Sequence, residues 1–142
     1  MAPQHTLALS FFASASLLAS VAVAQPAARG ERTFTTTLTG EAEVPGPGDE
    51  DGTGSATVTI SVPDREICYE ITVSDIEPVT AAHIHDAPAG VAGGVFVGLE
   101  FPSGCVDVTA SQAALILARP AQFYVNVHNA DFPGGALRGQ LG

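Results

Sequence analysis

The sequence predicts an all-β domain, an antiparallel sandwich of about eight short strands with one short helix. Most of the chain after residue 32 consists of short segments in which apolar and polar residues alternate, the pattern of strands buried on one face. The 15 glycines and 10 prolines separate these segments, and helical periodicity appears once, in residues 109–119. These observations favour many turns and strands over long helices.

The first 24 residues are typical of a secretory signal peptide. Residues 7–24 form an apolar run rich in Ala, Ser and Leu that ends in Ala22-Val23-Ala24, a pattern that favours cleavage after Ala24. Four serines interrupt the run, so it is marginal as a membrane span. We therefore expect a secreted or periplasmic protein with no membrane attachment after cleavage. Residues 25–32 are predicted to form a flexible leader, and residues 33–142 the folded domain.

The clearest strands form a hairpin. Residues 55–62 alternate strictly between polar and apolar side chains, a turn follows at residues 63–66, and residues 67–73 alternate again. Weaker patterns predict strands at residues 33–39, 81–85, 95–101, 105–108, 121–128 and 136–141. The helix is expected within residues 109–119, with Ser111 as its N-cap and Pro120 ending it.

Acidic residues dominate the charge. There are 15 acidic side chains against five arginines and no lysine, a formal charge of -10. This excludes a nucleic-acid partner, because polyanion binding depends on basic side chains. Mutual repulsion favours a monomer or weak dimer. Residues 40–54 hold five of the acids among glycines and prolines and are predicted to form a mobile acidic loop rather than a calcium site, since the EF-hand spacing is absent.

Two cysteines remain in the exported chain, Cys68 and Cys105. An oxidising compartment favours a disulfide between them, and the C-x-x-C spacing of a redox-active pair is missing. Cys68 has the parity of the outer face of its strand, so we expect the bridge outside the main core. It should stabilise the fold by about 4 kcal/mol.

Three histidines end predicted strands. His83 and His85 share one strand face because side chains alternate, and His128 ends a later strand. Three imidazoles from neighbouring strands would hold one metal ion such as copper or zinc. The alternative is that each ring only donates a hydrogen bond to a loop carbonyl. Asn126 shares the face of His128, where it either orients the imidazole or satisfies a loop.

The sequence offers no catalytic residues. It lacks a G-x-S-x-G nucleophile motif, and its acids gather in one loop instead of facing each other as a glycosidase pair would. The chain is therefore interpreted as a binding protein rather than an enzyme, with the ligand or partner left open.

Four motifs occur in order along the chain: GEAEVP at 40–45, AAHIH at 81–85, YVNVH at 124–128 and PGGALRGQL at 133–141. Together they closely resemble the chordin-type (CHRD) domain over residues 36–142. The resemblance implies an antiparallel, Greek-key-like (immunoglobulin-like) β-sandwich. The resemblance implies a fold more than a function. Together with the predicted export, it leads us to interpret the chain as an extracellular or periplasmic binding or interaction module, with the protein or small ligand left open.

A fainter similarity is to Cu/Zn superoxide dismutase. His83, His85 and His128 match three of its copper positions in order, and Arg138 falls in a comparable C-terminal stretch. A bridging fourth histidine and a zinc cluster are missing, although Asp86 would supply an oxygen ligand. The similarity implies at most a mononuclear copper or zinc site with redox or dismutase-like activity. Arg138 would pair with Asp131 or Asp86, or attract an anionic ligand.

Overall fold

The computed structural model describes residues 30–142, so the predicted signal peptide and most of the predicted leader lie outside the described residues. The all-β prediction with one short helix is confirmed. The strands are β1 (Glu31–Thr39), β2 (Thr53–Ser61), β3 (Glu66–Ser74), β4 (Ala81–Asp86), β5 (Gly94–Leu99), β6 (Ser103–Asp107), β7 (Phe123–His128) and β8 (Leu137–Gln140). The helix α1 (Ala110–Ala118) is followed by a 3-10 turn, η1 (Pro120–Gln122).

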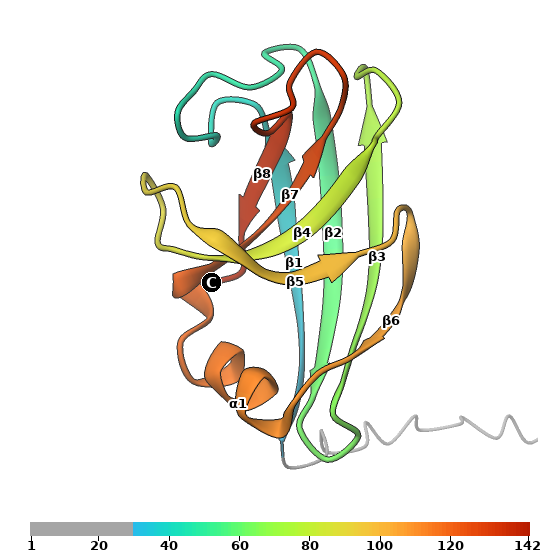
Figure 1. Ribbon diagram of the computed structural model, residues 1–142, viewed down its shortest axis with the longest axis vertical. Coiled ribbons are helices and arrows are strands. Elements are labelled where there is room, and N and C mark those ends of the chain that lie inside the picture. The colour runs from blue at the N-terminus through green and yellow to red at the C-terminus, as the bar shows by residue number, and fades with distance from the viewer. Residues whose placement is uncertain (1–29) are drawn as a thin grey trace, which may run out of the picture.

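All eight strands belong to one antiparallel sheet in the order β5-β4-β7-β8-β1-β2-β3-β6. The sheet curls on itself, so that β5 crosses in front of β1 and β2 (Figure 1). Its two edge strands, β5 and β6, are joined by a short turn, which makes the sheet nearly barrel-shaped. The strands therefore form one continuous hydrogen-bonded sheet, and the Greek-key detail of the expected sandwich stays a prediction.

Alternating side chains fill the inside of this barrel. The predicted hairpin is confirmed as β2 and β3, whose register runs from Thr53 opposite Ser74 to Ser61 opposite Glu66. Val58 and Ile60 of β2 and Ile84 of β4 have no exposed surface, and each contributes about 1.5–3 kcal/mol through burial. Side chains alternate between the two faces of each strand. Every second residue of β4 and of β7 therefore lies on the outer face of the sheet.

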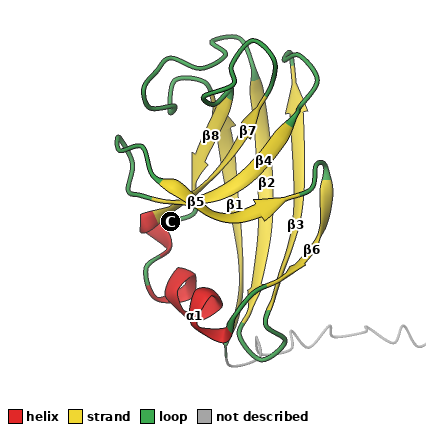
Figure 2. Ribbon diagram, viewed as in Figure 1, coloured by secondary structure: helices red, strands yellow, loops and turns green. Residues whose placement is uncertain are grey.

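The helix covers one end of the barrel (Figure 2). Ala113 and Ile116 are its buried residues. Its N-cap is Thr109 rather than the predicted Ser111: the Thr109 side chain accepts from the Gln112 amide, and the Gln112 side chain accepts from the Thr109 amide. This reciprocal capping box satisfies two amides at once, which explains why the helix begins there. No helix among residues 30–142 has the length and apolar character needed to cross a membrane.

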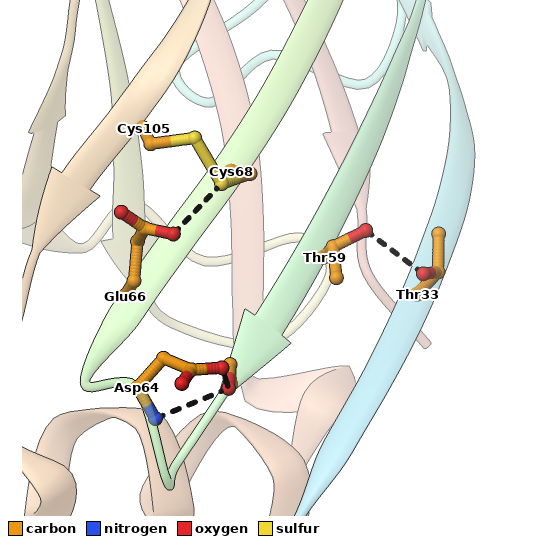
Figure 3. The surroundings of a disulfide bond; sticks show 7 residues. Thr33, Thr59, Asp64, Glu66, Cys68 and Cys105 are labelled. Atoms are coloured by element: carbon orange, nitrogen blue, oxygen red, sulfur yellow. Dashed lines mark hydrogen bonds between the residues drawn. A yellow bond between two sulfur atoms is a disulfide. The ribbon is translucent and has the colours of Figure 1, made fainter. Parts of the chain in front are cut away.

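The predicted disulfide between Cys68 and Cys105 is confirmed. The two residues are directly opposite each other in the register of β3 and β6, and the bridge lies on the outer face, as the parity of Cys68 predicts. Glu66 lies beside it, with Oε1 3.2 Å from the Cys68 sulfur (Figure 3). The bridge ties the edge strand β6 to the rest of the sheet.

Two boundaries differ from the predictions. Strand β1 begins at Glu31, within the predicted leader, because it pairs with β2 as far as Ser61. The acidic loop is not simply solvated: Glu43 and Asp49 are buried, and the Asp49 amide donates to the carbonyl of Ala136. This backbone hydrogen bond to the residue before β8 holds the loop against the barrel, which composition alone does not indicate.

Candidate metal centre

The structure brings His83, His85 and His128 together on the outer face of the sheet. One ring nitrogen from each lies within 4.8 Å of the others. The cause is the register of β4 and β7, in which Ala81 is opposite His128 and His83 is opposite Asn126. Because Ile84 occupies the core, its two neighbours must point outward, toward the rings of β7.

His85 is held in one tautomer by a loop. Its Nδ1 lies 3.0 Å from the carbonyl oxygen of Gly93, so Nδ1 carries the proton and donates. Nε2 is then an acceptor with a free lone pair. The side chain is only 7% exposed, and Nε2 has no hydrogen-bond partner. A buried acceptor without a partner costs about 1–3 kcal/mol.

His128 presents its Nε2 in the same way. Its Nδ1 donates to the carbonyl oxygen of Pro133 at 3.0 Å, which leaves Nε2 unprotonated in the neutral ring. Two atoms approach that nitrogen at 3.1 Å each: Nδ1 of His83 and Oδ1 of Asn126. The Asn126 oxygen is an acceptor facing an acceptor, an arrangement that a cation between them would stabilise.

Burial favours the uncharged form of two of the rings, His83 and His128. Desolvation lowers the pKa of His83, and the neighbouring His128 and His85 lower it further. Desolvation also lowers the pKa of His128; the Pro133 hydrogen bond opposes this shift and the proximity of His85 adds to it. Neutral imidazole is the form that binds a metal ion, so the environment favours the binding form at neutral pH.

Arg138 does not form the predicted ion pair with Asp131 or Asp86. Its guanidinium donates to the carbonyl oxygens of Val91 at 2.9 Å and Pro88 at 2.8 Å, and it lies over the ring of Tyr124. It is 1% exposed, so a free anionic ligand does not reach it. The planar guanidinium can donate to carbonyl oxygens as well as to carboxylates. The large number of acidic residues therefore did not predict the partners of Arg138 correctly.

Of the other predicted residues, the structure brings Asn126 to the centre and leaves Asp86 outside it. Asp86 is the last residue of β4, is exposed, and is not part of the histidine group. Strand alternation explains this, since Asp86 has the parity of Ile84 rather than of His83 and His85.

Sequence reasoning missed Glu43, which lies behind Asn126. This carboxyl is 5% exposed and packs against the backbone of Gly135. Burial raises its pKa, while the charge of Arg138 and hydrogen bonds from Asn126 and the Val44 amide partly offset that rise. The hydrogen bond from the Asn126 amide nitrogen leaves Oδ1 directed at His128. The one sequence signal that could have pointed to Glu43 was its position within the GEAEVP motif.

One cavity adjoins the centre at His83. This cavity of about 590 Å³ is lined in part by His83 and extends along Gly98 and Glu100 to Cys105; His85 and His128 do not line it. A hollow of about 660 Å³ lies elsewhere, between acidic residues that include Asp49 and Asp131, and none of the three histidines lines it.

A second group of potential ligands, Glu66, Cys68 and Cys105, lies within the same distance limit. Its two sulfur atoms are bonded to each other, and a disulfide sulfur is not the thiolate that binds metals. Within residues 30–142, the three histidines are therefore the group with free donor atoms.

Comparison with known proteins identifies the family. The family model of the CHRD domain matches residues 34–141. No curated protein and no solved structure matches the chain, so the similarity to Cu/Zn superoxide dismutase receives no support from these comparisons. The match covers most of the sequence and includes all three histidines, and the chain belongs to the CHRD-domain family.

Proposed function

We propose that this chain is an exported binding protein whose CHRD domain holds one transition-metal ion through His83, His85 and His128. The observation that carries the proposal is the Nε2 atom of His85, a buried acceptor without a partner that lies near two other imidazoles. A metal ion would use this lone pair and remove the cost of leaving it unsatisfied.

The donor atoms follow from the hydrogen bonds. His85 and His128 both donate through Nδ1 to loop carbonyls, which leaves Nε2 as the donor to a metal. His83 approaches with Nδ1, 3.1 Å from Nε2 of His128. Two nitrogens that bind one ion at about 2.0–2.1 Å are at most about 4.2 Å apart, so this separation suits a shared ion. Hydrogen bonds from ligand rings to carbonyls are the usual support of such sites.

Copper is the favoured ion. Three neutral imidazoles suit copper, zinc, nickel and iron, and the Irving–Williams order places Cu(II) above the other divalent ions at a nitrogen site. Bound copper would supply one-electron chemistry. The chain's own contribution is to orient three donors, to lower the pKa of His83 and His128 through burial and to leave a cavity beside His83.

Without a metal, one pair of rings can satisfy itself. If Nδ1 of His83 carries a proton, it donates to Nε2 of His128, and both atoms have partners. That arrangement still leaves Nε2 of His85 without one. His85 is therefore the residue that best separates a metal site from a purely structural cluster, and it is the residue to mutate.

The test is a titration of the tag-free, chelator-treated protein with Cu(II), Cu(I) and zinc, followed by elemental analysis. We expect one equivalent of copper in the wild type and its loss in His85→Ala. Asp51→Asn, in the acidic loop, is the matched control, because binding to surface acids would fall in that variant and binding to the histidines would not.

If His85→Ala does not fold, the partly exposed His83 provides a second variant, His83→Ala. Absence of any binding tighter than micromolar in the folded wild type would contradict the proposal. So would an equal affinity in wild type and both histidine variants.

A further inference from the structure

Arg138 is a buried cation whose hydrogen bonds all go to neutral groups. Besides the carbonyls of Pro88 and Val91, its guanidinium donates to Oε1 of Gln140 at 3.2 Å. Removing an arginine from water without a hydrogen-bonded anion costs several kcal/mol. The charge of Arg138 also acts on the buried Glu43 carboxyl, which offsets part of this cost through space and leaves the hydrogen bonds of the guanidinium to hold the neutral groups around it.

One connection runs from Arg138 to His85 through an aromatic ring. The guanidinium carbon lies 3.5 Å from the centroid of the Tyr124 ring. His85 stacks on the same ring, with centroids 4.8 Å apart and planes only 6° from parallel. Strand β7 lies between β4 and β8, so the two groups approach Tyr124 from opposite sides. The ring is clamped, and it limits the tilt of the imidazole.

A second connection runs through the loop between β4 and β5, residues 87–93. Arg138 holds this loop by the two carbonyls at Pro88 and Val91. Farther along the loop, the Gly93 amide donates to the Tyr124 hydroxyl at 3.2 Å. The Gly93 carbonyl then accepts the proton on Nδ1 of His85. The atom that selects the His85 tautomer therefore belongs to a loop that Arg138 fastens to β8.

We propose that Arg138 is the positioning residue of the centre, which keeps His85 in the tautomer and orientation that presents Nε2 to the metal. The metal itself rests on the function proposed above; the tautomer does not, since it is a property of the metal-free protein. Arg138 touches no metal ligand atom directly. It acts on one histidine by two routes that end on the same ring.

The test combines Arg138→Gln with a matched control, Arg32→Gln. Arg32 also lies over an aromatic ring, that of Phe34 at 4.5 Å, but it is on β1 and exposed. The first readout is the long-range ¹H–¹⁵N correlation spectrum of the metal-free protein, which reports which nitrogen of His85 carries the proton. The second is copper affinity by competition titration.

In wild type and Arg32→Gln we expect a single His85 tautomer protonated on Nδ1. In Arg138→Gln we expect a mixture of the two tautomers and a copper affinity lower by about 10–100-fold, the usual effect of losing a residue that orients a ligand. The copper stoichiometry should stay at one. A single unchanged tautomer together with an affinity within threefold of wild type would overturn the proposal.

Two further variants keep the proposal testable if Arg138→Gln does not fold. Arg138→Lys keeps the charge and loses the fork, so it should restore folding but not the single tautomer. Tyr124→Phe removes the hydroxyl that holds Gly93 and should weaken the tautomer preference while keeping the stack. If both leave His85 unchanged, the positioning role is refuted. If the wild type binds no copper, the metal proposal fails while the tautomer result still decides the role of Arg138.

Discussion

Replacing both cysteines, as Cys68→Ala with Cys105→Ala, should destabilise the domain without removing the metal centre. The bridge closes a loop with a sequence separation of 37 residues. The chain-entropy expression for a loop of this length gives about 4 kcal/mol at 25 °C. A domain of this size loses roughly 4 °C of Tm per kcal/mol, so the variant should melt roughly 15 °C below the oxidised wild type.

The assay is urea and thermal unfolding of the double variant beside oxidised and reduced wild type. Reduced wild type is the matched control, because it lacks the bridge but keeps both sulfur atoms, and it should unfold near the variant. Copper stoichiometry below the transition should be unchanged, since the cysteines lie on β3 and β6 and the histidines on β4 and β7. A decrease of less than about 1 kcal/mol in the free energy of unfolding would refute the entropic reasoning. Loss of copper binding in the folded variant would refute the independence of the disulfide and the histidine group.

Three other predictions follow from the same observations. Burial lowers the pKa of His83 and His128, so the unfolded chain takes up protons first as the pH falls below the ordinary histidine pKa of 6.5. The metal-free protein should therefore lose stability from that pH down to the lowered pKa values of the folded state. Thermal melts from pH 7.5 to 5 should show this loss, and a His83→Ala, His128→Ala double variant should show less of it. Ile84→Ala should cost about 2–5 kcal/mol in urea unfolding, because the side chain is fully buried, and a loss below 1 kcal/mol would contradict its place in the core. N-terminal sequencing of the exported protein should begin at Gln25, and a retained Met1 would contradict cleavage after Ala24.

Strand alternation was enough to predict most of the fold. The hairpin of β2 and β3 follows from strict alternation, and the same parity correctly places Cys68 outside the core. The closure of the sheet could not be predicted, because period 2 says which face is buried and not which strands are neighbours. The helix start was missed by two residues, since Thr109 and Ser111 are both good N-caps and only the reciprocal bond with Gln112 separates them.

The grouping of the three histidines was predictable, and the residues that surround them were not. His83 and His85 follow from spacing alone, and the place of His128 in a similar motif suggested the third ring. Glu43, Tyr124 and the Gly93 carbonyl reach the centre through loops and strand pairing far apart in sequence. Arg138 shows the limit most clearly: counting acids predicted an ion pair, whereas the buried guanidinium is satisfied by backbone carbonyls of a loop 47 and 50 residues away.

The two interpretations of the histidines, hydrogen bonding to loops and the proposed metal binding, are compatible with each other. His85 and His128 do donate to loop carbonyls, as the structural alternative required. Yet a neutral ring that donates through Nδ1 must present a lone pair at Nε2, so the same bond that anchors each ring also creates a metal donor. What distinguishes a metal site from an anchored ring is whether Nε2 then finds a protein partner. Nε2 of His128 has two polar neighbours, whereas Nε2 of His85 is buried and has no hydrogen-bond partner. Buried polar atoms without a partner are rare in native proteins, which favours a ligand at this atom.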